Sequence, residues 1–341
     1  MTLEEKIAQI ENIYIETRKI KEIMEDIDEA ILVGKASNYA SQPICTLVMG
    51  LSGVGKTSLK EHFEKKYPRK TIVDEDKEQV IVPILSTTLT DDKNPKAAPG
   101  KMLRDLGDLL QGAKGTRSEL GDRFTAQIND AQTQAIFIDE FQHAFEGASE
   151  SRKGSAANWI KTLINQTKRP VVLFGLPWCI ELLAQSSELR NRFDNIHYLE
   201  EYDQEDEMFA DWLELLEQVE KQLPFDKPSN LSNPELALRI LALTGGNISR
   251  LMKKLIKPAA RKALMSGEDC IGVHRLLAAA RKHMSVPEDY NPLSSKIDID
   301  NIEVKHFLTY EEQRRFKDKK ESRKYVEVGK DDSLADVFRP R

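Results

Sequence analysis

The stretch Gly50-Leu51-Ser52-Gly53-Val54-Gly55-Lys56-Thr57 has four residues between its outer glycines and Lys-Thr directly after the second. The apolar run at residues 44–49 precedes it and predicts a buried parallel strand, and residues 58–63 are typical of a helix. Strand, glycine loop and helix are the context that a phosphate-binding loop requires. We therefore predict such a loop here, the alternative being a chance glycine-rich turn.

The residue types in this loop fit a bound phosphate chain. The glycines allow a tight turn whose N–H groups point inward, and the N-terminus of the following helix favours an anion. Lys56 is expected to reach the β- and γ-phosphates, and the Thr57 hydroxyl to bind Mg²⁺. The predicted nucleotide-binding residues are Gly50, Ser52, Gly53, Val54, Gly55, Lys56, Thr57, Ser58 and Asp139.

A second motif, at residues 134–140, is an apolar run that ends in the carboxylates Asp139 and Glu140. This is the form of a Walker B strand. Asp139 is expected to hold Mg²⁺ through its water shell, and Glu140 to polarise the water that attacks the γ-phosphate. Strands often end in polar turns, so this motif gains its weight from occurring together with the phosphate loop.

Length and composition set the broad class of the protein. A chain of 341 residues can bury a sizeable core. The net charge of −6 does not advertise nucleic-acid binding, although 50 lysines and arginines can still cluster. Three widely spaced cysteines are typical of core residues in a reducing compartment. The sequence shows neither a membrane-spanning run nor a secretory leader, which predicts a soluble cytoplasmic protein without a membrane partner.

The order of the elements predicts an α/β fold. Strands that alternate with helices indicate a parallel sheet with right-handed crossovers, and ligands of such sheets bind at the carboxyl ends of the strands. One of the strands is expected at residues 79–86, with an edge or a bulge at Pro83. The predicted parts are an N-terminal helical segment (1–35) packed on the nucleotide domain, an α/β nucleotide-binding domain (36–202), an all-helical lid (203–283) and a polar, partner-binding C-terminal tail (284–341).

Three arginines are candidates for charge stabilisation. Arg190 and Arg192 precede a short predicted strand, and either can act as a finger on a neighbouring subunit's γ-phosphate. An ordinary surface pair is the equal alternative. Arg250 follows Asn247, which can cap a helix, and is a candidate for a contact to the nucleotide phosphates. The alternative for Arg250 is a solvated arginine on a capped helix.

Together these motifs resemble those of an AAA+ ATPase. The run Asp139-Glu140-Phe141-Gln142-His143 is similar to one in the TniB/TnsC group of transposition regulators. The resemblance implies a P-loop sheet followed by a small helical lid, an ATPase that uses ATP and Mg²⁺, Arg250 as second sensor, and Arg190 or Arg192 as the finger. Leu176 stands where that fold normally has a polar first sensor, so slow, regulatory hydrolysis is expected.

The resemblance also implies partners. Members of this group form ATP-dependent rings or filaments on duplex DNA, with about six or seven subunits per turn. They connect a TniQ/TnsD-type target selector, in CRISPR-associated transposons together with a CRISPR effector, to transposase subunits. Basic side chains facing the channel would grip the DNA phosphates. The candidates are Lys93, Lys96, Lys101, Arg104, Arg152 and Lys153.

Two other functions share the same motifs. An AAA+ ATPase of replication initiation or helicase loading usually carries a winged-helix or helix-turn-helix domain after the lid, and residues 284–341 show no clear one. A STAND-type signalling ATPase normally carries repeats or an effector domain, and the sequence shows neither. ATP rather than GTP rests on the family resemblance, since no Asn-Lys-x-Asp motif occurs.

Overall fold

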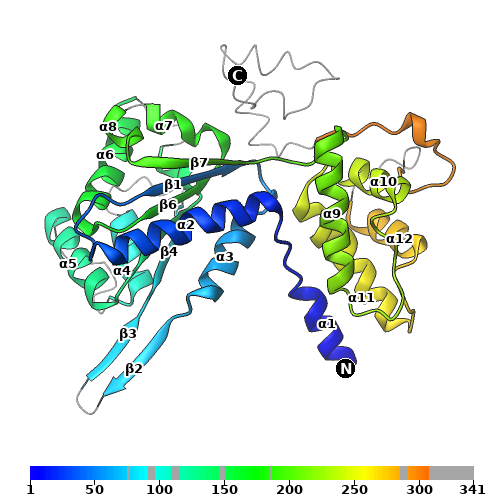
Figure 1. The fold of residues 1–341 in the computed structure, drawn as a ribbon, viewed down its shortest axis with the longest axis horizontal. Coiled ribbons are helices and arrows are strands. Elements are labelled where there is room, and N and C mark those ends of the chain that lie inside the picture. Colours follow the sequence, from blue (N-terminus) through cyan, green and yellow to red (C-terminus); the bar gives the residue numbers. More distant parts are fainter. Residues whose placement is uncertain are drawn as a thin grey trace. The chain divides into compact units, whose positions relative to one another are not determined.

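The computed structural model describes residues 1–74, 77–90, 97–108, 116–145, 150–184, 186–284 and 291–306. The chain divides into two compact units (Figure 1). We call them the α/β unit, with residues 18–50 and 56–199, and the helical unit, with residues 1–17, 51–55 and the described chain from Glu200 onward. None of the described helices is long and apolar enough to cross a membrane.

Five parallel strands form the sheet of the α/β unit. Their order across the sheet is β4 (Ile84–Thr88), β5 (Ala135–Asp139), β6 (Val171–Gly175), β1 (Cys45–Gly50) and β7 (Phe193–Leu199). Every residue of β1, β5 and β6 is buried, as expected for central parallel strands. The predicted parallel α/β sheet is confirmed, and the carboxyl ends of β1 and β5 lie at the same edge.

Helices cover both faces of this sheet, because successive side chains of a strand point to opposite faces. Ile136 and Ile138 share one core with α4 (Ala97–Leu106), α5 (Arg117–Asp130), α6 (Glu150–Thr167), α7 (Ile180–Ala184) and α8 (Ser187–Arg190). Phe137, between them, points the other way, and its ring lies 5.4 Å from that of Phe63 in α3 (Lys56–Lys66). Beside α3, α2 (Arg18–Ala36) packs on β1 and β7.

The prediction of one continuous strand at residues 79–86 is wrong, because these residues belong to two separate strands. Its first part belongs to β3 (Lys77–Ile81), which forms an antiparallel hairpin with β2 (Lys70–Asp74) that projects from the α/β unit (Figure 1). Its second part becomes β4, at the edge of the main sheet. The break falls at Pro83, which has no N–H to donate to a ladder. Its carbonyl instead accepts a hydrogen bond from the Gln134 N–H at 2.7 Å.

The helical unit contains α9 (Asp206–Gln222), α10 (Pro234–Thr244), the π-helical η3 (Arg250–Ile256), α11 (Lys257–Met265) and α12 (Val273–His283). These elements pack around one apolar core that includes Trp212. The N-terminal α1 (Leu3–Glu11) also packs here, where Gln9 Nε2 donates to the Gln222 carbonyl at 2.9 Å. The N-terminal segment that we predicted as one part is therefore shared: α1 belongs to the helical unit and α2 to the α/β unit.

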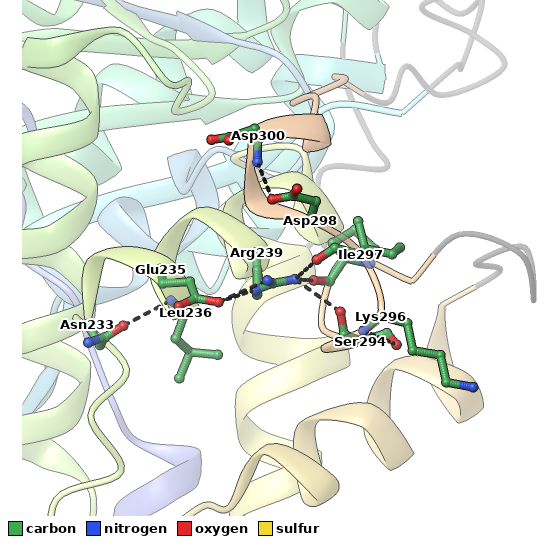
Figure 2. A network of polar contacts seen from close by, with 10 residues as sticks. Asn233, Glu235, Leu236, Arg239, Ser294, Lys296, Ile297, Asp298 and Asp300 are labelled. Carbon is green, nitrogen blue, oxygen red and sulfur yellow. Dashed lines mark hydrogen bonds and ion pairs between the residues drawn. The ribbon is translucent and has the colours of Figure 1, made fainter.

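Residues 291–306, which we call the strap, lie on the helical unit and include η4 (Ile299–Asn301). Figure 2 shows the anchor at one end of the strap, Arg239 of α10, which also contacts Glu235. The Arg239 guanidinium donates hydrogen bonds of 2.9, 3.1 and 3.1 Å to the carbonyls of Pro292, Ser294 and Ile297. Leu293 is buried in the same core. Of the tail that we predicted at residues 284–341, residues 285–290 and 307–341 lie outside the described residues.

Candidate functional site

The flanks of the predicted phosphate loop lie in the α/β unit. Strand β1 ends at Gly50, and α3 begins at Lys56. The Lys56 ammonium donates to the Gly50 carbonyl at 2.6 Å, which holds this cation at the carboxyl edge of the sheet. Thr57 and Ser58 are exposed in the first turn of α3, where the backbone N–H groups have no partner within the helix. This arrangement suits an anion at the helix N-terminus.

The loop itself, residues 51–55, belongs to the helical unit. Gly53 and Gly55 have φ angles of +88° and +112°, in the left-handed region that other residues avoid. The Gly53 carbonyl accepts from the Ser249 N–H at 2.9 Å, and the Ser52 carbonyl accepts from Asn247 Nδ2 at 2.8 Å. A Cβ atom on Gly53 would lie 2.5 Å from Asn247 Oδ1. Both the backbone angle and this close approach therefore require glycine.

Asp139, at the end of β5, has an ion-pair partner that the sequence analysis missed. Its Oδ2 lies 2.8 Å from Lys60 Nζ, and both side chains are almost fully buried. Lys60 is one helical turn beyond Lys56, so the i, i+4 spacing places both lysines on the same side of α3. That spacing was the available signal. A buried carboxylate needs such a partner, because an unpaired buried charge is costly.

The donor set at this edge suits Mg²⁺ bound together with phosphates. A carboxylate and a hydroxyl, from Asp139 and Thr57, are the hard oxygen donors that Mg²⁺ prefers. No group of three or more His, Cys, Asp or Glu side chains within the described residues could hold a metal by itself. Mg²⁺ usually takes one or two carboxylates and completes its shell with water and phosphate oxygens. The residues present therefore fit this ion as a nucleotide-bound cofactor.

Glu140 is held by its neighbours in an unusual backbone conformation. Its φ and ψ angles are 53° and 41°, in the left-handed region, where a residue with a side chain is strained. Its N–H donates to Asp139 Oδ1 at 2.9 Å. Its carboxylate accepts a hydrogen bond from Gln142 Nε2. Such strain persists only where the surroundings enforce it, so the backbone and a side chain together fix the direction of the Glu140 carboxylate.

Gln142, in the 3₁₀-helix η1 (Phe141–Ala144), also reaches the end of β6. Its Oε1 accepts from the Leu176 N–H at 3.3 Å, just before the 3₁₀-helix η2 (Pro177–Cys179). The side-chain amide of Gln142 thus lies at the end of β6, where the sequence offers only the apolar Leu176. The sequence analysis did not predict this polar group. A Cβ atom on Gly175 would lie 3.1 Å from Gln142 Oε1, so glycine leaves room for this approach. The sequence feature that could have indicated this role is the position of Gln142, two residues after Glu140.

The three candidate arginines differ in their surroundings. Arg192 is 12% exposed and lies 3.5 Å from Glu188, so it is engaged within the α/β unit. Arg190, at the end of α8, is exposed. Arg250, in the helical unit, begins η3, and its N–H donates to Asn247 Oδ1 at 3.1 Å. Of the two candidate fingers, Arg190 is the one that faces solvent.

Of the six candidate DNA-binding residues, the structure describes two side chains. Lys101 and Arg104 both lie on α4, and Lys101 Nζ is 3.3 Å from Asp105 Oδ2. Arg104 is exposed. The backbone of Arg152 and Lys153 lies in α6, whereas Lys93 and Lys96 fall outside the described residues.

Comparisons with known proteins place these observations in a family. The solved structures with a similar fold include the ORC2 protein of Aeropyrum pernix in ADPNP-ADP complexes, with a TM-score of 0.57, 14% identity and coverage of 82% of this chain and 72% of that chain. They also include Cdc6p of Pyrobaculum aerophilum, with a TM-score of 0.54, 13% identity and coverage of 83% and 72%. A third is the Walker-type ATPase PABY2304 of Pyrococcus abyssi, with a TM-score of 0.51, 14% identity and coverage of 80% and 72%.

At such low identities these likenesses show the fold alone, which is that of AAA+ ATPases. A search of curated proteins found no match. A family model described as "Bacterial TniB protein" matches residues 6–203, more than half of the chain. The match spans the sheet, both candidate nucleotide motifs and the hairpin, and the chain therefore belongs to the TniB family.

Proposed function

We propose that this chain is a Mg²⁺-dependent ATPase that assembles on duplex DNA in its ATP-bound state and regulates DNA transposition. One observation carries the nucleotide part of the proposal. The Lys56 ammonium and the Asp139-Glu140 pair lie at the carboxyl edge of one parallel sheet, which is where such sheets bind ligands. TniB-family membership supports the transposition part.

Each of the candidate site residues in the α/β unit has a distinct part in the proposed reaction. Lys56 binds the β- and γ-phosphates, and Thr57 and Asp139 hold Mg²⁺, which neutralises charge on the phosphates when bound. Glu140 orients and polarises the attacking water. Gln142 keeps the Glu140 carboxylate in place, and so takes over the positioning that a polar residue at Leu176 would provide. Hydrolysis can then proceed without the missing hydroxyl.

Assembly brings further groups to the reaction. Arg190 is exposed, so it can act on the γ-phosphate of a neighbouring subunit in a ring or filament. Arg250 contacts the phosphates within its own chain. Rings or filaments bind DNA through its phosphates, with Lys101 and Arg104 as the described members of the candidate set. The assembled protein then connects a target selector to transposase subunits.

Electron microscopy and ATPase assays of the full chain test this proposal. With duplex DNA and a non-hydrolysable ATP analogue, the protein should form rings or filaments that are absent without nucleotide and in Lys56→Ala. Glu140→Gln is the matched control, because it should keep assembly with ATP and lose hydrolysis. A monomeric protein that ignores DNA, or a Lys56→Ala variant that assembles like the wild type, would refute the proposal.

A further inference from the structure

Asn247 joins three segments of the helical unit. Its Nδ2 donates to the Ser52 carbonyl in the phosphate loop at 2.8 Å and to Glu201 Oε1 at 2.7 Å. Its Oδ1 accepts from the Arg250 N–H at 3.1 Å. The residue is only 4% exposed. Both N–H donors of one buried amide are therefore used, one on the phosphate loop and the other on a buried carboxylate.

Glu201 connects Asn247 to the far end of the strap. Its Oε2 lies 3.3 Å from His306 Nδ1, and the two side chains are 4% and 7% exposed. The same His306 nitrogen lies 3.1 Å from the Gly245 carbonyl. Burial disfavours the charged imidazolium, but Glu201, this carbonyl and the nearby Asp203 together outweigh burial and raise the pKa of His306. A charged His306 thus compensates a buried carboxylate.

The turn between α10 and η3 fixes the spacing of this network. The Tyr202 N–H donates to the Gly246 carbonyl at 3.1 Å, so the segment after β7 is bound to the turn that carries Asn247. Gly246 has a φ angle of +69°, and a Cβ atom there would clash with the Tyr202 backbone. The positions of Glu201 and Asn247 are therefore set by backbone contacts as well as by their own side chains.

The strap is attached at two places. Arg239 holds residues 292–297 by their carbonyls (Figure 2), and His306 holds the following end through Glu201. Leu293, within the first attachment, and Ile302, between the two attachments, are both buried. His306 is in this way linked to the backbone of the phosphate loop through two buried polar side chains, those of Glu201 and Asn247.

We propose that Asn247, oriented by Glu201 and His306, is a positioning residue that sets the conformation of the phosphate loop, so that the strap controls nucleotide affinity. This inference rests on the proposed nucleotide-binding function. Withdrawal of His306 leaves Glu201 buried without its cation, which is unfavourable. Glu201 then shifts toward water, and Asn247 loses the acceptor that fixes its amide. The Ser52 carbonyl loses a fixed donor as a result.

The test is the affinity of the full chain for a fluorescent ATP analogue, measured by anisotropy with Mg²⁺ present. Asn247→Asp keeps an acceptor for the Arg250 N–H, removes both donors and sets a second carboxylate against Glu201. Both changes release the Ser52 carbonyl while the cap of the following helix is kept, so the variant separates loop positioning from helix capping. We expect its affinity to fall about tenfold, and that of Glu201→Gln and His306→Gln about threefold, as for the loss of one or two hydrogen bonds. Lys56→Ala should lose binding altogether.

A pH series separates positioning from a general loss of structure. As the pH rises through the raised pKa of His306, above its ordinary value near 6.5, its charge is lost and the affinity of the wild type should weaken. His306→Gln should lack this step. The ionisation of the nucleotide is common to both proteins and cancels in the comparison.

Each outcome decides between the two proposals. If Lys56→Ala loses binding but Asn247→Asp binds within about twofold of the wild type, loop positioning is wrong. If Asn247→Asp does not fold, His306→Gln provides the test instead. If the pH profile of its nucleotide affinity is identical to that of the wild type, the strap does not control nucleotide affinity. If the wild type binds no nucleotide, or Lys56→Ala binds normally, the proposed function fails first and this inference fails with it.

Discussion

Replacing Gln142 tests whether its amide positions the carboxylate of Glu140, which we propose to be catalytic. In Gln142→Leu, which has a similar volume, Glu140 loses the hydrogen bond that fixes its carboxylate, and the buried Leu176 N–H loses its acceptor. A hydrogen bond to a charged group contributes about 1.5–3 kcal/mol, and a buried donor left without a partner costs about 1–3 kcal/mol. Since about 1.4 kcal/mol equals a factor of ten, the first loss predicts a fall in kcat of about tenfold to hundredfold.

The second loss affects stability rather than catalysis, and a matched variant separates the two. Gln142→Glu keeps an acceptor for the Leu176 N–H but cannot donate to Glu140 when ionised. Steady-state ATPase assays on DNA should show reduced kcat in both variants and little change in KM, because neither change removes a phosphate contact. Melting temperature should fall in both variants, in Gln142→Leu because the Leu176 N–H loses its acceptor and in Gln142→Glu because a buried carboxylate then faces Glu140. A kcat within about twofold of the wild type in both variants would refute the positioning role.

Three further perturbations follow from single contacts. Lys60→Met removes the cation of a buried ion pair and should destabilise the protein by about 3–5 kcal/mol in Mg²⁺-free denaturation, less with Mg²⁺ and nucleotide bound. Burial lowers the pKa of His197, so the unfolded chain takes up the proton first as the pH falls. Stability should therefore drop below about pH 6.5, and His197→Gln should flatten that part of the urea-midpoint profile. Gly246→Ala, whose Cβ would meet Tyr202, should cost about 2 kcal/mol or more, clearly above Gly267→Ala, which shares the positive φ angle in open space.

The sequence was enough to predict the sheet, the strand, loop and helix around residues 50–57 and the strand that ends at Asp139, because all of these depend on local patterns. Six consecutive buried residues in β1 produce an apolar run that any window of the sequence shows. The loop at residues 50–57 needs glycine where the backbone has positive φ angles, so its spacing is also visible. The Asp139-Glu140 pair is adjacent in the chain. Each of these predictions used residues that are neighbours in sequence.

The parts that the sequence did not predict depend on distant partners or on weak patterns. Strand β2 (Lys70–Asp74) is short and partly polar, so its sequence resembles that of a loop. Gln142 contacts a residue 34 positions away, and Asn247 contacts Ser52 across 195 positions. Neither residue is part of the repeating apolar pattern from which helices and strands are predicted. The contacts of Gln142 appear only when the α/β unit brings the ends of β5 and β6 together, and those of Asn247 only when the helical unit brings its own turns together.

The hydrogen bonds of Asp139 also limit how it can serve Mg²⁺. Its Oδ1 accepts from the Glu140 N–H, and its Oδ2 pairs with Lys60. Both oxygens therefore have partners before any ion binds. Because Mg²⁺ gives up its water reluctantly, a carboxylate already engaged in this way is better suited to accept hydrogen bonds from the ion's water shell than to replace that water. Lys60 would then do more than stabilise the fold: its ion pair would hold the Asp139 carboxylate in place for an outer-shell contact, and the contrast between Mg²⁺-free and Mg²⁺-bound stability in Lys60→Met would measure that contribution.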